Sequence, residues 1–133
     1  MSEHTEIPTD LRYTSDHEWI RREGNGLVTV GITAYASSQL GDVVFVELPA
    51  SGGKVTAKQP FGVVESVKSV SDLFAPVSGQ VAEVNTALQD SPEAVNSDPY
   101  GQGWMIRIQP ADPREMDTLL TPQAYAAQLG QGG

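Results

Sequence analysis

Two apolar runs that meet at a single lysine, Lys68, limit the fold of this chain more than any other feature. Both runs are rich in Val, Leu and Phe, and with the lysine they fill residues 61–77. Pro60 and Pro76 bracket Lys68 at equal sequence distances. Apolar runs between turn formers are typical of strands, so the segment predicts a β-hairpin that turns at Lys68. The turn lacks the Gly or Asn of a primed two-residue turn. We therefore expect a type I turn that exposes Lys68 on a rigid support.

The rest of the chain alternates short apolar segments with turn formers, a pattern that predicts further strands. The segments are residues 17–23, 27–33, 42–48, 80–85 and 104–109. Residues 27–33 alternate apolar with small or polar side chains, as a half-buried strand does. Residues 50–59 are expected to form a loop, and residues 86–99 an irregular stretch with one helical turn near residues 91–94. Many short strands without βαβ spacing predict a mainly β fold, a flattened barrel or a sandwich.

Start and stop signals predict a few short helices. Thr33 can cap a helix over residues 34–40, which Gly41 would end. Near the end of the chain, Asp112-Pro113 and Thr121-Pro122 each place a capping residue before a proline, which predicts two closing helices. The second of these is expected to end at Gly130. The predicted fold is thus mainly β with short helices and a C-terminal helical segment.

The length and charge of the chain limit its organisation and its partners. With 133 residues it is expected to be one domain over residues 11–130, with a flexible arm at residues 1–10 and a tail at residues 131–133. The net charge of −9 makes nucleic acid and anionic membranes poor partners and favours basic surfaces of other proteins. There are no cysteines, so neither a disulfide nor a thiolate nucleophile is available.

No segment marks the chain for a membrane or for export. No apolar run approaches the roughly 20 residues that a membrane helix needs. Residues 1–10 carry three acidic residues, no Arg and no apolar block, so they resemble neither a secretory signal nor a transit peptide. We therefore predict a cytoplasmic location.

No catalytic or metal-binding constellation is visible in the sequence. The two histidines, His4 and His17, cannot form a metal cluster without cysteines, and no serine stands in a nucleophile-elbow pattern. His17, expected in a strand beside Trp19, is interpreted as a packing or surface residue and not as a base. The sequence thus predicts that the protein is not an enzyme and holds no metal.

Several blocks of the sequence resemble one family of carrier proteins. Glu65-Ser66-Val67-Lys68 closely resembles the lipoyl-lysine segment of the glycine cleavage system H protein. Residues 13–19, 30–33, 40–49 and 98–104 resemble other segments of that family, in the family's order, with Gln102 where Glu is common. Val67 and Ser69 replace the methionines that flank the lysine of biotin carriers, which argues against biotin.

The resemblance implies a fold of the lipoyl/biotinyl-carrier type, with lipoate joined to Lys68 as an amide. It implies that Glu65 is recognised by the lipoylating enzyme, a lipoate ligase or a lipoyl/octanoyl transferase. The arm would receive the aminomethyl group of glycine from a pyridoxal-phosphate glycine decarboxylase. It would pass that group to a tetrahydrofolate-dependent aminomethyltransferase, and a dihydrolipoyl dehydrogenase would reoxidise it. The resemblance further implies that Glu18 and Asp72 shelter the loaded arm.

Two other interpretations stay open at the level of sequence. The chain could be a lipoyl domain of a 2-oxo-acid dehydrogenase complex, although the helices after Asp112 and the absence of a linker argue against it. It could also be an unmodified interaction module that resembles H proteins, or one that relays lipoyl groups to other enzymes. Shuttling between partners favours a monomer.

Overall fold

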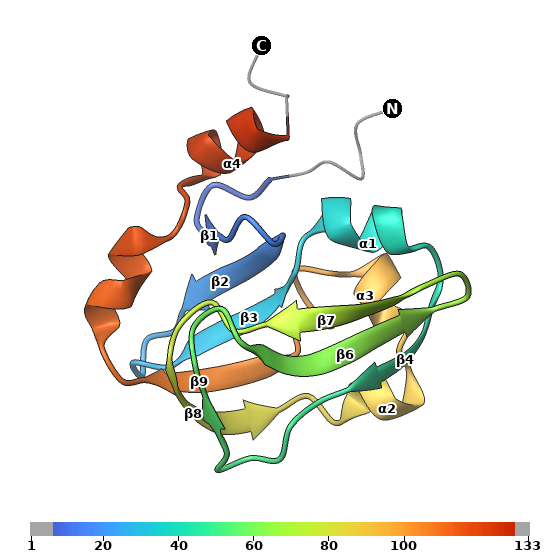
Figure 1. Ribbon diagram of the computed structural model, residues 1–133, viewed down its shortest axis with the longest axis horizontal. Helices are drawn as coiled ribbons and strands as arrows, with labels where there is room; N and C mark the ends of the chain where they lie inside the picture. The colour runs from blue at the N-terminus through green and yellow to red at the C-terminus, as the bar shows by residue number, and fades with distance from the viewer. Residues whose placement is uncertain (1–6, 130–133) are drawn as a thin grey trace.

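The computed structural model describes residues 7–129, and within that range the strands form two antiparallel sheets (Figure 1). The larger sheet has six strands in the order β1-β2-β3-β9-β8-β5, and the smaller has three in the order β4-β6-β7. Their bounds are β1 (Arg12–Tyr13), β2 (Glu18–Arg22), β3 (Val28–Ile32), β4 (Val43–Glu47), β5 (Lys54–Val55), β6 (Pro60–Ser66), β7 (Val70–Phe74), β8 (Gly79–Val84) and β9 (Ile106–Pro110). The predicted mainly β fold is confirmed. The described strands form two separate sheets, so the sandwich describes the fold better than a closed barrel.

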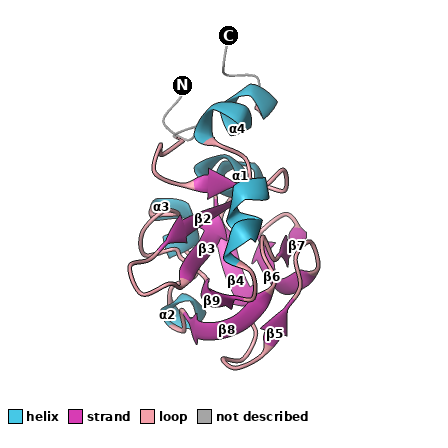
Figure 2. Cartoon of the chain, turned by 90° about the vertical axis from the view of Figure 1, so that its left-hand side faces the viewer, coloured by secondary structure: helices cyan, strands magenta, loops and turns pink. Residues whose placement is uncertain are grey.

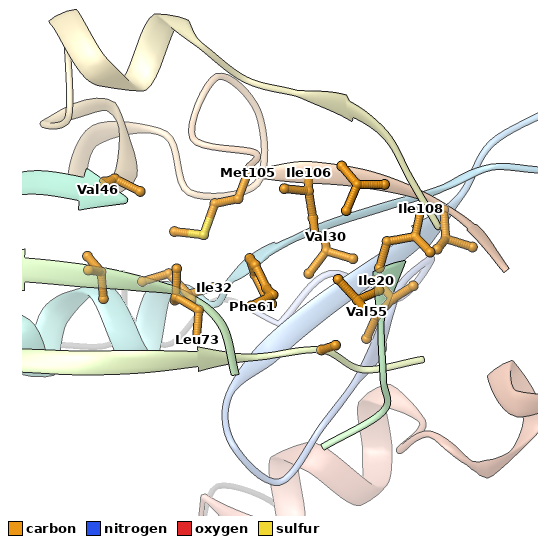
Figure 3. Packing of buried hydrophobic residues seen from close by; sticks show 14 of the residues in the cluster. Ile20, Val30, Ile32, Val46, Val55, Phe61, Leu73, Met105, Ile106 and Ile108 are labelled. Atoms are coloured by element: carbon orange, nitrogen blue, oxygen red, sulfur yellow. The ribbon is translucent and has the colours of Figure 1, made fainter. Parts of the chain in front are cut away.

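The main core lies between the two sheets (Figure 3). The larger sheet contributes Ile20, Val30 and Ile106, and the smaller sheet contributes Val46 and Leu73, all of them buried. Burying one such side chain contributes roughly 1.5–3 kcal/mol. The alternation of apolar residues along each strand therefore fixes which face turns inward, since a slip of one residue would expose the whole set.

Strand β3 is buried on both faces, so the prediction that it is half-buried is wrong. A second cluster covers the outer face of the larger sheet and consists of Leu11, Tyr13, Trp19 and Tyr125. The Trp19 ring lies over Gly31, where an added Cβ would stand 2.7 Å from the ring. The ring of Tyr125, from the last helix, stacks on Tyr13 with the centroids 4.6 Å apart. This cover comes from distant parts of the chain, and the alternation within one strand cannot show it.

Short helices lie at the edges of the sandwich, and α4 stands at one end beside β1 (Figure 2). The helix predicted over residues 34–40 is confirmed as α1 (Ala34–Leu40), with the Thr33 hydroxyl accepting from the backbone N–H of Ala36. The predicted cap of α4 (Pro122–Gln128) is also present, as Thr121 accepts from the N–H of Ala124. Two further helical turns are α2 (Ala87–Asp90) and α3 (Ala94–Ser97). None of the described helices is long and apolar enough to cross a membrane.

The first closing helix is a 3-10 helix, η2 (Pro113–Thr118), not an ordinary α-helix. Its predicted cap is correct, since the Asp112 carboxylate accepts from the N–H of Arg114. The helix stops at Thr118 because the chain then pairs with β1. There Leu120 and Tyr13 exchange backbone hydrogen bonds of 2.7 and 3.0 Å.

Two other local expectations are wrong. The loop predicted over residues 50–59 contains β5, whose two residues pair with β8. His17 precedes β2 in a tight turn with φ +71°, held by a hydrogen bond from its N–H to the carbonyl of Thr14. The Gly130 helix end, the tail and residues 1–6 of the predicted arm lie outside the described residues, and α4 ends at Gln128.

Candidate functional site

The hairpin predicted around Lys68 is formed by β6 and β7, and its tip reaches the edge of the molecule (Figure 1). The N–H of Ser66 donates to the carbonyl of Ser69 at 2.8 Å, and the Ser66 hydroxyl accepts from the N–H groups of Lys68 and Ser69. No residue of the tip has a positive φ, so the turn is not a primed one, as the sequence predicts. Lys68 is exposed on a turn whose backbone is hydrogen-bonded.

The tip is fastened to the loop that follows α1. The N–H of Val67 donates to the carbonyl of Asp42 at 3.0 Å. The Lys68 side chain lies against Gly41, where an added Cβ would stand 3.4 Å from the Lys68 Cε. Asn96 of α3 holds this loop by donating to the Gly41 carbonyl and accepting from the Val43 N–H, both at 2.8 Å. Sequence reasoning missed Asn96, because one amide within an irregular polar stretch gives no sign of its partners.

A cleft of about 320 Å³ lies between α1 and β7, next to the place where Lys68 rests. We call it the α1–β7 cleft, and it is lined by Asp16, His17, Glu18, Ile32, Tyr35, Ala36, Gln39, Leu40, Val64, Ser71, Asp72 and Leu73. Leu40 is the residue before Gly41, so the Lys68 side chain lies at the end of α1 that borders the cleft. The lining combines apolar side chains with three carboxyl groups.

Glu18 and Asp72 both line this cleft, although they come from different sheets. Asp72 is exposed on the edge strand β7, four residues from Lys68, or about 13 Å at an extended spacing of about 3.3 Å per residue. Glu65, the third acidic residue singled out from the sequence, is exposed on β6 and is not part of the cleft lining. The structure thus groups Lys68, Glu18 and Asp72 around one cleft and leaves Glu65 outside it.

Glu18 is not an ordinary surface acid, because its side chain is almost fully buried at 2% exposure. One carboxylate oxygen accepts from the Thr14 hydroxyl at 2.6 Å, and the other accepts from the N–H of Phe74 at 3.3 Å. Burial raises the pKa of Glu18 from its ordinary 4.5 to about 7, because these two hydrogen bonds only partly offset the loss of water. A cation placed against Glu18 would favour its ionised form.

One wall of the cleft is fixed by the last helix. The Tyr125 hydroxyl lies 2.8 Å from the His17 Nδ1 and 2.8 Å from the Thr33 hydroxyl, which caps α1. The His17 ring also contacts Tyr35, with the centroids 4.9 Å apart. Burial lowers the pKa of His17, and the nearby Asp16 opposes that effect. Sequence reasoning missed Tyr125, because nothing in a C-terminal helix indicates contact with residues more than ninety positions earlier.

A lysine held at an exposed hairpin tip beside a mixed apolar and acidic cleft is the arrangement expected of a carrier domain. A sequence model of the family described as "Glycine cleavage H-protein" matches residues 11–131. The chain belongs to the glycine cleavage H-protein family, the lipoyl carriers of the glycine cleavage system.

Individual relatives agree with this family over nearly the whole chain. The chain is 58% identical to the glycine cleavage system H protein of Geobacillus kaustophilus over 94% of its own length and 98% of that protein. It is 54% identical to the glycine cleavage system H protein of Halorhodospira halophila over 97% of its own length and 99% of that protein. The crystal structure of a glycine cleavage system H protein from Mycobacterium marinum matches with a TM-score of 0.86 at 50% identity, covering 93% of this chain and 99% of that one. Neither a 2-oxo-acid dehydrogenase lipoyl domain nor an unmodified module is favoured by these matches.

Proposed function

We propose that this protein carries lipoate as an amide on Lys68 and moves the aminomethyl group of glycine between the enzymes of the glycine cleavage system. The observation that supports the site most directly is the position of Lys68. It is exposed at the tip, while its side chain lies against Gly41 at the border of the α1–β7 cleft. An arm rooted there can extend toward a partner or lie in the cleft. Lys54 lies on β5 of the larger sheet, and Lys58 precedes β6 at the opposite end of the hairpin from the tip.

The residues present fit such an arm. The cleft volume of about 320 Å³ is within the range of small-molecule sites, which are roughly 300–1,000 Å³. Its apolar residues, among them Ile32, Val64 and Leu73, suit a hydrocarbon chain. The carboxyl groups of Glu18 and Asp72 suit a cationic end, because a charge-assisted hydrogen bond to a carboxylate is stronger than a neutral one.

When attached, lipoate supplies a disulfide that accepts the aminomethyl group and is reduced in the transfer. The chain contributes position, shelter and charge. Glu18 and Asp72 would hold the aminomethyl nitrogen as a cation, and Ile32 and Leu73 would limit the access of water to the labile group. The hairpin holds the root of the arm rigid, which raises the effective concentration of its end at each active site.

The roles of the partner enzymes are proposals of the same kind. Glycine decarboxylase, the aminomethyltransferase and dihydrolipoyl dehydrogenase would each act on the arm, with the protein itself serving as a carrier and not as an enzyme. Glu65, exposed three residues before Lys68, would be read by the lipoate ligase or the lipoyl/octanoyl transferase. A monomeric state and a cytoplasmic location stay predictions of the sequence.

The test of this function is Lys68→Arg in glycine-dependent NADH production with the three partner enzymes supplied. Arginine keeps the charge of an exposed residue, so the free energy of unfolding should change by no more than about 0.5 kcal/mol. It cannot form the lipoyl amide, so activity should be lost. Lys58→Arg is the matched control and should retain activity. Substantial activity in the folded Lys68→Arg protein would refute the proposed function.

A further inference from the structure

The large apolar side chains that are most exposed in residues 7–129 gather at the hairpin tip. They are Val44 at 50%, Phe45 at 49%, Val67 at 70% and Val70 at 65% exposure. None of them lines the α1–β7 cleft. Clustered apolar exposure of this kind marks an interaction site more often than a chance arrangement.

The pairing of the strands brings these residues together. Phe45 on β4 and Val70 on β7 are both paired with Glu65 on β6, so the three side chains form one row across the smaller sheet. The register of β4 shifts between Val43 and Phe45, and this bulge turns two consecutive apolar residues, Val44 and Phe45, toward solvent. Regular alternation would have exposed only one of them. We call Val44, Phe45, Glu65, Val67 and Val70 the tip face.

The border of the tip face is acidic. Asp42 and Glu47 are exposed next to it on the loop before β4 and at the end of that strand, and Glu65 stands within it. The nearest cation by sequence is Lys68, whose charge is lost when its amine becomes an amide. The other seven cations lie on the larger sheet, on η2 or at the opposite end of the hairpin; they are Arg12, Arg21, Arg22, Lys54, Lys58, Arg107 and Arg114.

We propose that the tip face is the docking surface for the decarboxylase that loads the arm, whose matching surface offers apolar side chains within a rim of Lys and Arg. This inference rests on the proposed function of Lys68. An apolar centre with a charged border is the usual composition of an interface. An interface built around four apolar side chains forms a weak, transient complex, which suits a carrier that must leave after each transfer. Because Val67 adjoins Lys68, docking would fix the root of the arm at the mouth of the partner's active site.

The experiment measures glycine decarboxylation as a function of the concentration of lipoylated carrier, after intact mass has shown full lipoylation of each variant. The double variant Val44→Thr with Phe45→Thr keeps β-forming residues at exposed positions, so it should fold. We expect its KM to rise about tenfold or more, with kcat within about twofold, because removing central apolar contacts weakens docking and leaves the arm intact. Leu27→Thr is the matched control. It replaces an apolar residue that lies between β2 and β3, outside both core clusters, and it should leave KM unchanged.

Two charge-reversing variants test the acidic border of the tip face. Glu47→Lys should raise KM, whereas Asp117→Lys, on the exposed side of η2, should leave it unchanged. The KM of the protein without substitutions should rise with salt concentration. If the protein without substitutions is active and the double variant has the same KM, the docking surface is refuted and the proposed function is not. An unchanged protein that accepts no lipoate overturns the proposed function and the docking surface with it. A dimer of the unchanged protein that the double variant converts to a monomer in sedimentation would show that a second copy covers the tip face, which also overturns the proposal.

Discussion

Replacing Glu18 with Gln should make the protein more stable at neutral and alkaline pH. The Glu18 carboxyl group is 2% exposed, and burial raises its pKa from the ordinary 4.5 to about 7. At about 1.4 kcal/mol per tenfold change in proton affinity, ionised Glu18 destabilises the fold by about 3 kcal/mol relative to its neutral form. Glutamine has nearly the same shape and no charge, so it avoids the cost of burying an ionised carboxylate.

The sign of the pH dependence follows from linkage. Between pH 4.5 and about 7 the folded protein holds the Glu18 proton more tightly than the unfolded chain does. The stability that neutral Glu18 contributes is therefore fully present below pH 4.5 and is lost as the pH rises to about 7. The free energy of unfolding of Glu18→Gln minus that of the unchanged protein should rise by up to about 3 kcal/mol over this window.

The assay is urea unfolding at pH 4.5 and pH 8, followed by the fluorescence of Trp19 and Trp104 with the denaturant slopes compared. Glu47→Gln, the same substitution at an exposed position, controls for the change in net charge. A difference between Glu18→Gln and the unchanged protein that is the same at both pH values would refute the reasoning. It would mean that Glu18 has no unusual proton affinity in the folded state.

Three other variants test the cleft and its walls. If the loaded arm is sheltered, it should decay spontaneously faster in Glu18→Gln with Asp72→Asn than in the unchanged protein, and equal decay rates would exclude that role. Gly41→Ala should lower the free energy of unfolding by roughly 1–3 kcal/mol, because the backbone of Gly41, with φ +82° and ψ −159°, is strained for a residue that carries a Cβ. Tyr125→Phe should lower it by roughly 1–2 kcal/mol, because the hydroxyl that joins the imidazole to the helix cap is lost; an unchanged urea midpoint would contradict this.

Features that depend on neighbouring residues could be predicted from the sequence. The hairpin at Lys68 follows from apolar runs between two prolines, and the Thr33 and Thr121 caps follow from the residues beside them. The pairing of Leu120 with Tyr13 after η2 could not be predicted in this way, because the two residues lie far apart in the chain.

The candidate site was only partly predictable for the same reason. The resemblance to H proteins pointed to Glu18 and Asp72, and the structure places both in one cleft. One hydrogen bond to the buried Glu18 carboxylate comes from the N–H of Phe74, 56 residues away. The position of His17 depends on Tyr125, 108 residues away. Contacts of this kind arise from the packing of two sheets and a terminal helix, and no local pattern encodes them.

The central claim is that Lys68 carries the lipoyl group, and peptide mapping tests it most directly. The protein would be produced together with a lipoate ligase, its intact mass measured, and its peptides sequenced by mass spectrometry. The account predicts the mass increment of one lipoyl amide, located on Lys68, with Lys54 and Lys58 unmodified. Lipoate found on Lys54 or Lys58 while Lys68 is intact and free would contradict it.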